Sequence, residues 1–244
     1  MQKQSWSVIV LCYNEESSIK EVVNNAITKF RELSNNNFEI IIVNDGSTDN
    51  SAKQIEQLKS DNPNLVNVIS HPTNMGIGYG LRSGYFSAQK ENVIFIPGDA
   101  QYDLNELDSY ASFPDKEIIC FYRVENTQYS IMRNGLSLIN KLLNRFFLGI
   151  KLRDVNWVKA YKTKYLKDLD LQLTSSLIES EICAKLILYG IKPIEVRSKY
   201  LVRKGGKSKG ANLKIVLKAL FDVINLIFIV NKFKKSNNNL LKIR

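Results

Sequence analysis

The sequence predicts an α/β protein in which a mostly parallel central sheet is flanked by helices. From Ser5 to Phe95, short runs rich in β-branched residues alternate with longer segments whose apolar residues recur at helical spacing, and this is the pattern of β-α-β units. The chain has 244 residues, of which 44% are hydrophobic and 24% charged. That length allows one substantial core and is too short for two full domains with linkers.

The first part of the chain contains four strand signals and three helix signals. Asp49 is the expected N-cap of the second helix, because an aspartate side chain there accepts hydrogen bonds from amides of the first turn. The predicted strands are Ser7 to Leu11, Phe38 to Val43, Leu65 to Ser70 and Asn92 to Ile96, and the predicted helices are Ser17 to Leu33, Asp49 to Lys59 and Gly78 to Lys90.

The pattern changes after Asp99. We assign residues 1–210 to the main domain, 211–232 to an amphipathic helix and 233–244 to a basic, disordered tail, because Asn and Lys dominate from Asn231 onward. In order, the predicted elements are a helix near Leu104 to Phe113, a strand near Glu117 to Tyr122, a helix from about Gln128 to Gly149, a mixed region through Val196 and a basic loop from Arg203 to Lys209.

Composition excludes several kinds of site. The three cysteines lack metal-ligand spacing and His71 is the only histidine, which excludes a Cys/His zinc site and a nucleophile paired with histidine. The net charge of +10 indicates a polyanionic partner without choosing among nucleic acid, acidic lipid and phosphorylated small molecules. Near the start, the apolar run Val8 to Cys12 is too short for a signal peptide or a span, so we expect a cytoplasmic protein.

Polar clusters follow each of the first four predicted strands. In a parallel sheet the carboxyl ends of the strands meet at one edge, where ligands bind, so we expect these clusters to face one pocket. Taken singly, two of the clusters could equally be ordinary turns. The clusters are Tyr13 to Glu16, Asn44 to Asp49, Pro72 to Gly80 and Gly98 to Gln101.

Four segments, SVIVLCYNEE, EIIIVNDGSTDNS, NMGIGYGLRSGYFSA and IFIPGDAQYD, resemble in order and spacing the nucleotide-sugar motifs of family 2 glycosyltransferases. The resemblance is close from Ser5 to Asp103 and looser beyond. It implies that residues 1–210 form a GT-A (Rossmann-like) catalytic domain that transfers a sugar with inversion from a UDP- or GDP-linked donor. The donor-binding residues that it implies are Tyr13, Asn14, Glu15, Asp45, Ser47, Asn74, Gly76 and Gly78.

The family's Asp-x-Asp-x-Gln metal motif corresponds here to Pro97-Gly98-Asp99-Ala100-Gln101, with proline in place of the first acid. The implied cofactor is a divalent cation, Mg²⁺ or Mn²⁺, bound by Asp99 and Gln101 together with the donor diphosphate and water. Asp103 is a weaker candidate ligand. The cation would neutralise charge on the leaving nucleotide diphosphate.

The predicted helix from Gln128 to Gly149 is the candidate acceptor site. In the polyprenyl-phosphate branch of the family, an Arg-x-x-x-Ser pair such as Arg133 and Ser137 lies in the acceptor site, and Arg123 could join it as a phosphate ligand. The alternative is the solvated face of an amphipathic helix. On one side of this helix lie Arg133, Ser137, Asn140 and Asn144, while Ile131, Leu138, Leu142 and Phe146 can pack away from it.

Arg203 to Lys209 resembles the family's late R-x-x-G-x-S-K loop, which implies that Arg203 and Lys209 meet the diphosphate or the acceptor phosphate. A solvated run of charges is the alternative. If the acceptor is a sugar hydroxyl, Asp154, Glu179 or Glu181 must act as general base. A phosphate monoester acceptor needs none, because its second pKa of about 6 leaves it a dianion at neutral pH.

The predicted helix from Leu213 to Val230 would be about 27 Å long, close to the bilayer core of about 30 Å. A polar stripe that includes Lys218 and Asp222 makes spanning unfavourable. We therefore expect this helix to attach the enzyme peripherally to the cytoplasmic face of a membrane, helped by the lysines that follow. The alternative is packing onto the core or onto a second subunit.

The interpretation that accounts for most of these features is an inverting hexosyltransferase acting on a polyprenyl (dolichyl- or undecaprenyl-type) phosphate. A family 2 enzyme acting on a saccharide hydroxyl, in surface-glycan or polysaccharide synthesis, is the alternative. An inactive scaffold stays open because of Pro97. A nucleic-acid-binding module is suggested by charge alone and has no readable motif, so we expect no nucleic acid partner; a homo-oligomer is compatible with the sequence.

Overall fold

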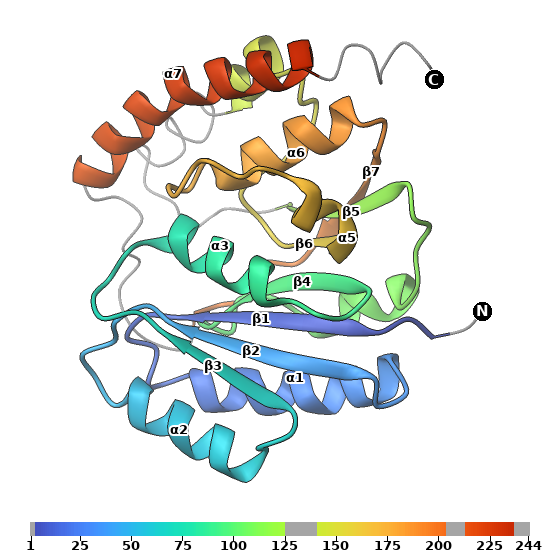
Figure 1. The fold of residues 1–244 in the computed structure, drawn as a ribbon. Coiled ribbons are helices and arrows are strands. Elements are labelled where there is room, and N and C mark those ends of the chain that lie inside the picture. The colour runs from blue at the N-terminus through green and yellow to red at the C-terminus, as the bar shows by residue number, and fades with distance from the viewer. Residues whose placement is uncertain (1–2, 125–140, 204–212, 237–244) are drawn as a thin grey trace.

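A computed structural model describes residues 3–124, 141–203 and 213–236, with the side chains of the last helix described from residue 222. A seven-stranded sheet forms the centre of the molecule, with helices on both sides (Figure 1). The elements are β1 Trp6–Cys12, α1 Ile19–Leu33, β2 Phe38–Asn44, α2 Ser51–Asp61, β3 Val66–Ser70, α3 Ile77–Ser87, β4 Asn92–Pro97, the 3₁₀ helix η1 Leu104–Tyr110, β5 Glu117–Arg123, β6 Lys159–Lys162, α5 Thr163–Asp168, α6 Ile178–Leu188, β7 Lys192–Ser198 and α7 Leu213–Ser236.

The strand order is β3-β2-β1-β4-β6-β5-β7, and only β6 runs antiparallel to its neighbours among these strands. The predicted α/β class with a mostly parallel sheet is therefore confirmed. In the parallel part, Cys12 pairs with Asn44, and Leu11 pairs with Pro97. This register brings the carboxyl ends of β1, β2 and β4 to the same edge of the sheet, where their polar loops begin.

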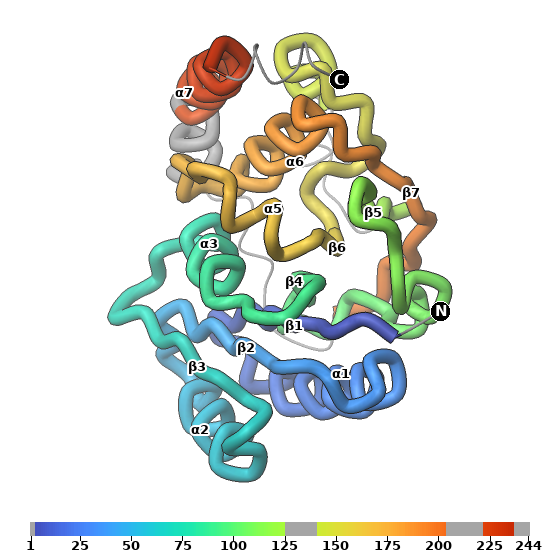
Figure 2. Tube along the Cα trace, turned by 45° about the vertical axis from the view of Figure 1, so that its right-hand side comes forward, coloured from blue at the N-terminus to red at the C-terminus, as the bar shows by residue number. Residues whose placement is uncertain are grey.

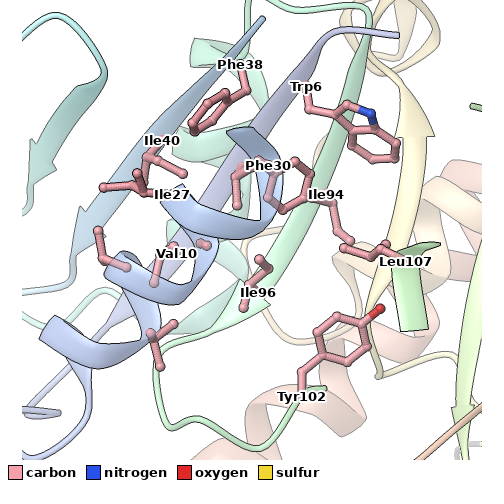
Figure 3. Packing of buried hydrophobic residues seen from close by; sticks show 14 of the residues in the cluster. Trp6, Val10, Ile27, Phe30, Phe38, Ile40, Ile94, Ile96, Tyr102 and Leu107 are labelled. Carbon is pink, nitrogen blue, oxygen red and sulfur yellow. The ribbon is translucent and has the colours of Figure 1, made fainter. Parts of the chain in front are cut away.

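Helices bury both faces of the parallel strands (Figure 2). On one face, Ile27 and Phe30 of α1 pack over strand residues such as Ile40 and Ile94 (Figure 3). On the other face, α3, α5 and α6 contribute to a second apolar cluster. Burial on both faces explains why the strands read as continuous β-branched runs and not as an alternating pattern.

Three predicted elements differ in detail. Helix α3 ends at Ser87 and not at the predicted Lys90. The N-cap of α2 is Asn50 and not Asp49, although the Asp49 carboxylate still accepts a hydrogen bond from the backbone N–H of Ser51 at 2.9 Å. The segment from Leu104 forms a 3₁₀ helix that ends at Tyr110, and not an α-helix to Phe113.

The last helix is longer than predicted and packs on the domain. Helix α7 continues to Ser236, so the part of the predicted disordered tail up to that residue is helical. Leu226 and Val230 are buried in the same apolar cluster as α6, and the rings of Tyr189 and Phe233 stack edge to face at 5.0 Å. None of the described helices is long and apolar enough to cross a membrane.

The described end of the predicted acceptor helix has the opposite orientation from the one expected. Residues 141–147 are helical. Asn144 is buried, whereas Leu142 and Phe146 are exposed. The prediction that these two apolar side chains pack inward is therefore wrong, because the neighbouring α7 covers the other side of this segment.

Candidate active site

The loops after β1 and β2 are tied together by short polar side chains. The Asn14 side chain forms three hydrogen bonds with Thr48: its Nδ2 donates to Thr48 Oγ1 (3.2 Å), and its Oδ1 accepts from the Thr48 backbone N–H (2.7 Å) and from the Thr48 hydroxyl (3.4 Å). The backbone N–H of Asn14 donates to Ser47 Oγ (3.1 Å), and that of Glu15 donates to Ser51 Oγ (2.9 Å). The left-handed φ of Asn14, 56°, suits asparagine. The two polar clusters therefore form one continuous surface.

Asp45 joins this surface to the loop after β3. Its Oδ1 accepts from the backbone N–H of Met75, and its Oδ2 accepts from that of Gly76, both at 2.9 Å. Asp45 Oδ1 also lies 2.7 Å from His71 Nδ1, and His71 Nε2 lies 3.0 Å from Ser83 Oγ. The carboxylate predicted to contact base or ribose thus already shapes the loop at this edge, a role that sequence reasoning missed. The position of the only histidine directly after β3 was the available signal.

Three glycines near this edge meet different surroundings. A Cβ on Gly46, where φ is 68°, would lie 2.4 Å from the backbone carbon of Thr73, so only glycine fits. A Cβ on Gly78 would lie 2.0 Å from the carbonyl oxygen of Ser175, so the close approach that Gly78 permits is to its own chain. Gly76, with φ of 92°, has nothing within 4 Å of a built Cβ and leaves the open space predicted for a ligand.

The remaining predicted donor residues lie on the same loops. Tyr13 is half-buried between β1 and Asn14, and Asn74 is exposed in the loop after β3. Ser47 Oγ is engaged by the Asn14 amide described above. The structure thus brings all the predicted donor residues to one edge of the sheet.

Asp99 lies on the other side of the end of β1. The backbone N–H of Gly98 donates to Leu11 O (3.1 Å), and Ser18 Oγ donates to Gly98 O (2.8 Å), which fixes the turn before Asp99. Burial raises the pKa of Asp99, against the opposing effect of the Arg203 guanidinium. The carboxylate therefore lies in poorly solvated surroundings, where interactions with a cation are strong.

The Arg203 guanidinium lies between the carboxylates at the ends of β1 and β4. Its Nη2 contacts Glu15 Oε1, and its Nη1 lies 3.4 Å from Asp99 Oδ2. All three side chains are largely buried. A cationic group is thus accommodated at the oxygens that would face a metal ion, and a hard divalent cation prefers carboxylate oxygens. Asp99 therefore fits the predicted role of metal ligand.

Gln101 does not fit the role as well. Its Oε1 accepts from the Tyr200 hydroxyl (3.0 Å), and its Nε2 donates to Leu201 O (3.3 Å). Both halves of the amide therefore hold the segment that leads to Arg203. The weaker candidate, Asp103, caps η1 by accepting from the backbone N–H of Asn105 (3.0 Å).

Within the part of the chain that the structure describes, no group of three or more His, Cys, Asp or Glu side chains could hold a metal ion. A cation at Asp99 would therefore take most of its ligands from the donor diphosphate and water. This agrees with the loss of the first motif acid at Pro97.

Arg123 and Asp154 form one unit and not two separate groups. Arg123 Nε donates to Asp154 Oδ2 (2.7 Å), and Nη2 donates to Oδ1 (3.1 Å). The guanidinium carbon lies 4.7 Å from the ring centre of Trp157 and 5.6 Å from that of Tyr200. Because Tyr200 also bonds Gln101, these aromatic rings connect the pair to the loop after β4. Sequence reasoning named both charged residues and missed Trp157 and Tyr200.

Glu179 and Glu181 are removed from the candidate bases. Glu179 is buried, accepts from the hydroxyls of Tyr85 (2.7 Å) and Tyr161 (2.5 Å), and pairs with Lys159 at 3.2 Å. Glu181 is fully buried and pairs with Lys185 at 2.6 Å. Both glutamates therefore hold the core together, and neither is available to a substrate hydroxyl.

Three predicted acceptor-site residues lie outside the described residues: Arg133, Ser137 and Lys209. Their predicted roles stay predictions. The other residues predicted to act on the acceptor or on the diphosphate, Arg123, Asp154 and Arg203, are described.

Comparison with known proteins agrees with this geometry. A glucosyl-3-phosphoglycerate synthase of Mycobacterium tuberculosis, solved with Mn²⁺, UDP-glucose and phosphoglyceric acid, matches with a TM-score of 0.65 at 14% identity, over 93% of this chain and 79% of that one. A mannosyltransferase of Pyrobaculum calidifontis, solved with GDP-Man and Mn²⁺, matches with a TM-score of 0.59 at 14% identity, over 97% and 76%. The fold is therefore that of a GT-A glycosyltransferase.

The family follows from the sequence. The model described as "Glycosyl transferase family 2" matches residues 7–168, and the chain belongs to this family. An undecaprenyl-phosphate 4-deoxy-4-formamido-L-arabinose transferase of Proteus mirabilis is 26% identical over 224 residues, which are 91% of this chain and 67% of that protein.

Proposed function

We propose that this glycosyltransferase moves a sugar with inversion from a nucleotide-diphosphate donor to a polyprenyl phosphate at the cytoplasmic face of a membrane. The observation that carries the proposal is the position of the Arg203 guanidinium between Glu15 and Asp99, at the edge where the loops after β1, β2 and β4 meet. A cationic side chain and two carboxylates at one strand edge suit a bound diphosphate with its cation.

On the donor side, the loops after β1, β2 and β3 would hold the nucleoside, with Tyr13, Glu15 and Asn74 closest to it. A divalent cation, when bound at Asp99, would neutralise charge on the diphosphate. Asp45 would act on the donor mainly through the backbone, because both of its oxygens fix the Met75 and Gly76 amides. The loop is therefore shaped before the donor arrives, which lowers the entropy lost on binding.

Arg203 would change partners during the reaction. In this structure it neutralises Glu15 and Asp99. With donor and cation bound, its guanidinium would turn to the diphosphate oxygens, for which its planar fork of donors is well suited. Charge grows on these oxygens as the bond to the sugar breaks, so a cation held there stabilises the transition state.

On the acceptor side, a phosphate acceptor is favoured because the three candidate general bases are all held in ion pairs. A sugar hydroxyl needs a base, and Glu179 and Glu181 are buried in ion pairs. Asp154 is the one that remains of the three candidates, and both of its oxygens bond Arg123. A phosphate dianion needs no base, and Arg123 could orient it. The Proteus mirabilis relative, by its name, acts on undecaprenyl phosphate.

The test is transfer of labelled sugar from a panel of UDP- and GDP-linked donors, with Mn²⁺, Mg²⁺ or a chelator present. Polyprenyl phosphate and an oligosaccharide serve as competing acceptors. We expect label in an acid-labile lipid fraction, with dependence on the cation, and an inverted anomeric linkage in the NMR spectrum of the product. Label appearing only in the oligosaccharide would refute the lipid acceptor and leave the transferase assignment in place.

A further inference from the structure

We infer that the outer surface formed by residues 141–147 and α7 docks onto an anionic lipid bilayer. We call this surface the docking face. It gathers large apolar side chains that soluble proteins normally bury: Phe146 and Phe228 are 74% and 70% exposed. It consists of Leu142, Phe146, Phe147, Ile224 and Phe228, with the cations Lys141, Arg145, Lys232, Lys234 and Lys235 around them.

The two segments are neighbours in the fold. Leu143 and Phe147 line the same small cavity as Val223 and Ile227 of α7. On α7, Leu226 and Val230 point into the core, whereas Ile224 and Phe228 lie one turn apart on the outward side. Figure 1 shows α7 and the helix near residue 145 lying together beyond α6, at the far side of the molecule from α2.

The charges on this face indicate which kind of partner it binds. Residues 141–147 and 222–236 carry the five exposed cations and a single acid, the half-buried Asp222. Exposed phenylalanines flanked by lysines match a bilayer with acidic headgroups, since rings enter the acyl boundary and cations meet the lipid phosphates.

A second copy of the chain is a poorer occupant of this face. In a two-fold interface a surface meets itself, so five cations would face five more. Protein interfaces are also depleted in lysine. The inference rests on the proposed function in one respect: an enzyme that uses a polyprenyl acceptor must reach that lipid at a membrane.

The test is co-sedimentation of the full chain with vesicles, without donor or acceptor, so that its result is independent of catalysis. We expect binding to phosphatidylcholine vesicles that contain phosphatidylglycerol, weaker binding at raised salt, and little binding to phosphatidylcholine alone. The double variant F146S/F228S should lower the partition coefficient roughly tenfold for each ring removed. K232Q/K235Q should lower it roughly fivefold for each lysine removed.

Matched controls lie outside the docking face. Phe86→Ser on α3 removes another exposed ring, and K53Q/K59Q removes two exposed lysines of α2. Neither should change vesicle binding. Melting curves establish that each variant is folded.

Three results separate the possible outcomes. If F146S/F228S binds anionic vesicles as well as the unsubstituted chain, the docking face is wrong. If the same variant turns a dimer into a monomer and leaves vesicle binding unchanged, the face is a self-association surface and the inference is overturned. If the chain binds vesicles through this face yet transfers no sugar to polyprenyl phosphate, the proposed acceptor fails and the docking face stands.

Discussion

The two halves of the sheet hold their polar groups by different means. The first half of the sheet comprises the strands up to Gln101. We call the loops after its strands β1, β2 and β3 the donor edge. These loops are joined by short side chains and backbone amides, as between Asn14 and Thr48. No lysine described in that half is buried, whereas Lys159, Lys162 and Lys185 are fully buried in the second half, each paired with a glutamate. The donor edge is thus set locally, while the second half depends on long charged side chains.

The difference has a functional meaning. Short bonds within adjacent loops give a rigid edge that is ready for a nucleotide. Long arginine side chains, such as Arg203, can exchange one partner for another without moving the sheet. A rigid donor edge and exchangeable cations would suit the proposed function, in which a nucleotide-diphosphate donor and a lipid phosphate bind at the same site.

The largest expected effect is at Asp99, where the two halves meet. We expect Asp99→Asn to lower transfer about a thousandfold, because an amide cannot offset the charge of the cation and diphosphate. The melting temperature should not fall, since burial raises the pKa of Asp99 and its ionised form is therefore poorly accommodated at neutral pH.

Steady-state kinetics and thermal melts measure these two effects. Asp103→Asn is the matched control, because asparagine can still cap η1; its transfer rate should stay close to that of the unsubstituted enzyme. A fully active Asp99→Asn enzyme would remove Asp99 from the site.

The next effect, on stability, tests the buried pairs of the second half. Lys159 is fully buried; burial alone would lower the pKa of its ammonium, but the nearby Glu179 carboxylate and other anionic groups raise it above its usual value. Lys159→Met should lower the free energy of unfolding by about 3 kcal/mol, because Glu179 is left charged and unpaired by a cation. Urea denaturation measures this loss.

The double variant K159M/E179Q should recover part of that stability, because the uncompensated charge is gone. Lys53→Met, at an exposed position of α2, should change stability by less than about 0.5 kcal/mol. Equal losses for Lys159→Met and Lys53→Met would mean that the second half does not depend on its buried charges.

The same contrast explains how far the sequence could be interpreted. Strands β1 to β4 were predicted within about a residue at each end, because strands buried on both faces give unbroken apolar runs. The meeting of four polar loops followed from the parallel order alone. These features depend on local pattern and on one topological rule.

The second half could not be predicted in the same way. Lys159 pairs with Glu179 and Lys162 with Glu91 across the fold, while Lys185 pairs with Glu181 one turn away on α6; the sequence pattern does not reveal that these charged side chains are buried. Glu179 and Glu181 therefore looked like candidate bases. Phe146 looked like a core residue for a related reason: helical spacing gives the faces of a helix but not which face the rest of the chain covers.

A smaller effect on turnover is expected at Arg203, which belongs to the second half and contacts Glu15 and Asp99 of the first. Arg203→Gln should lower kcat roughly a hundredfold, because a cation at the leaving diphosphate is lost. Stability should fall by about 1 to 2 kcal/mol, less than for Lys159→Met, because Glu15 and Asp99 lose a cationic partner but keep more contact with solvent than Glu179 does.

Stopped assays at saturating donor, with urea denaturation alongside, test this prediction. Arg153→Gln, at an exposed arginine that pairs weakly with Glu195 at 3.9 Å, is the matched control and should keep full turnover. If Arg203→Gln instead unfolds the protein at much lower urea, the guanidinium is part of the structure and not a mobile cation.

The smallest effect is expected within the rigid donor edge and tests whether that edge is set locally. Asn14→Gly keeps the left-handed backbone, with φ of 56°, and removes all the side-chain bonds from Asn14 to Thr48. We expect a loss of about 1 kcal/mol in the free energy of unfolding. The KM for the donor should rise severalfold while kcat changes little, because the loop that receives the nucleotide loses order and the reacting groups do not.

Asn36→Gly is the matched control: its φ is 64° and it is exposed on the loop before β2, so the same change should leave stability and KM nearly unaltered. A fall in kcat alone for Asn14→Gly would mean that Asn14 acts in the chemical step, and the division between a rigid donor edge and exchangeable cations would then not hold.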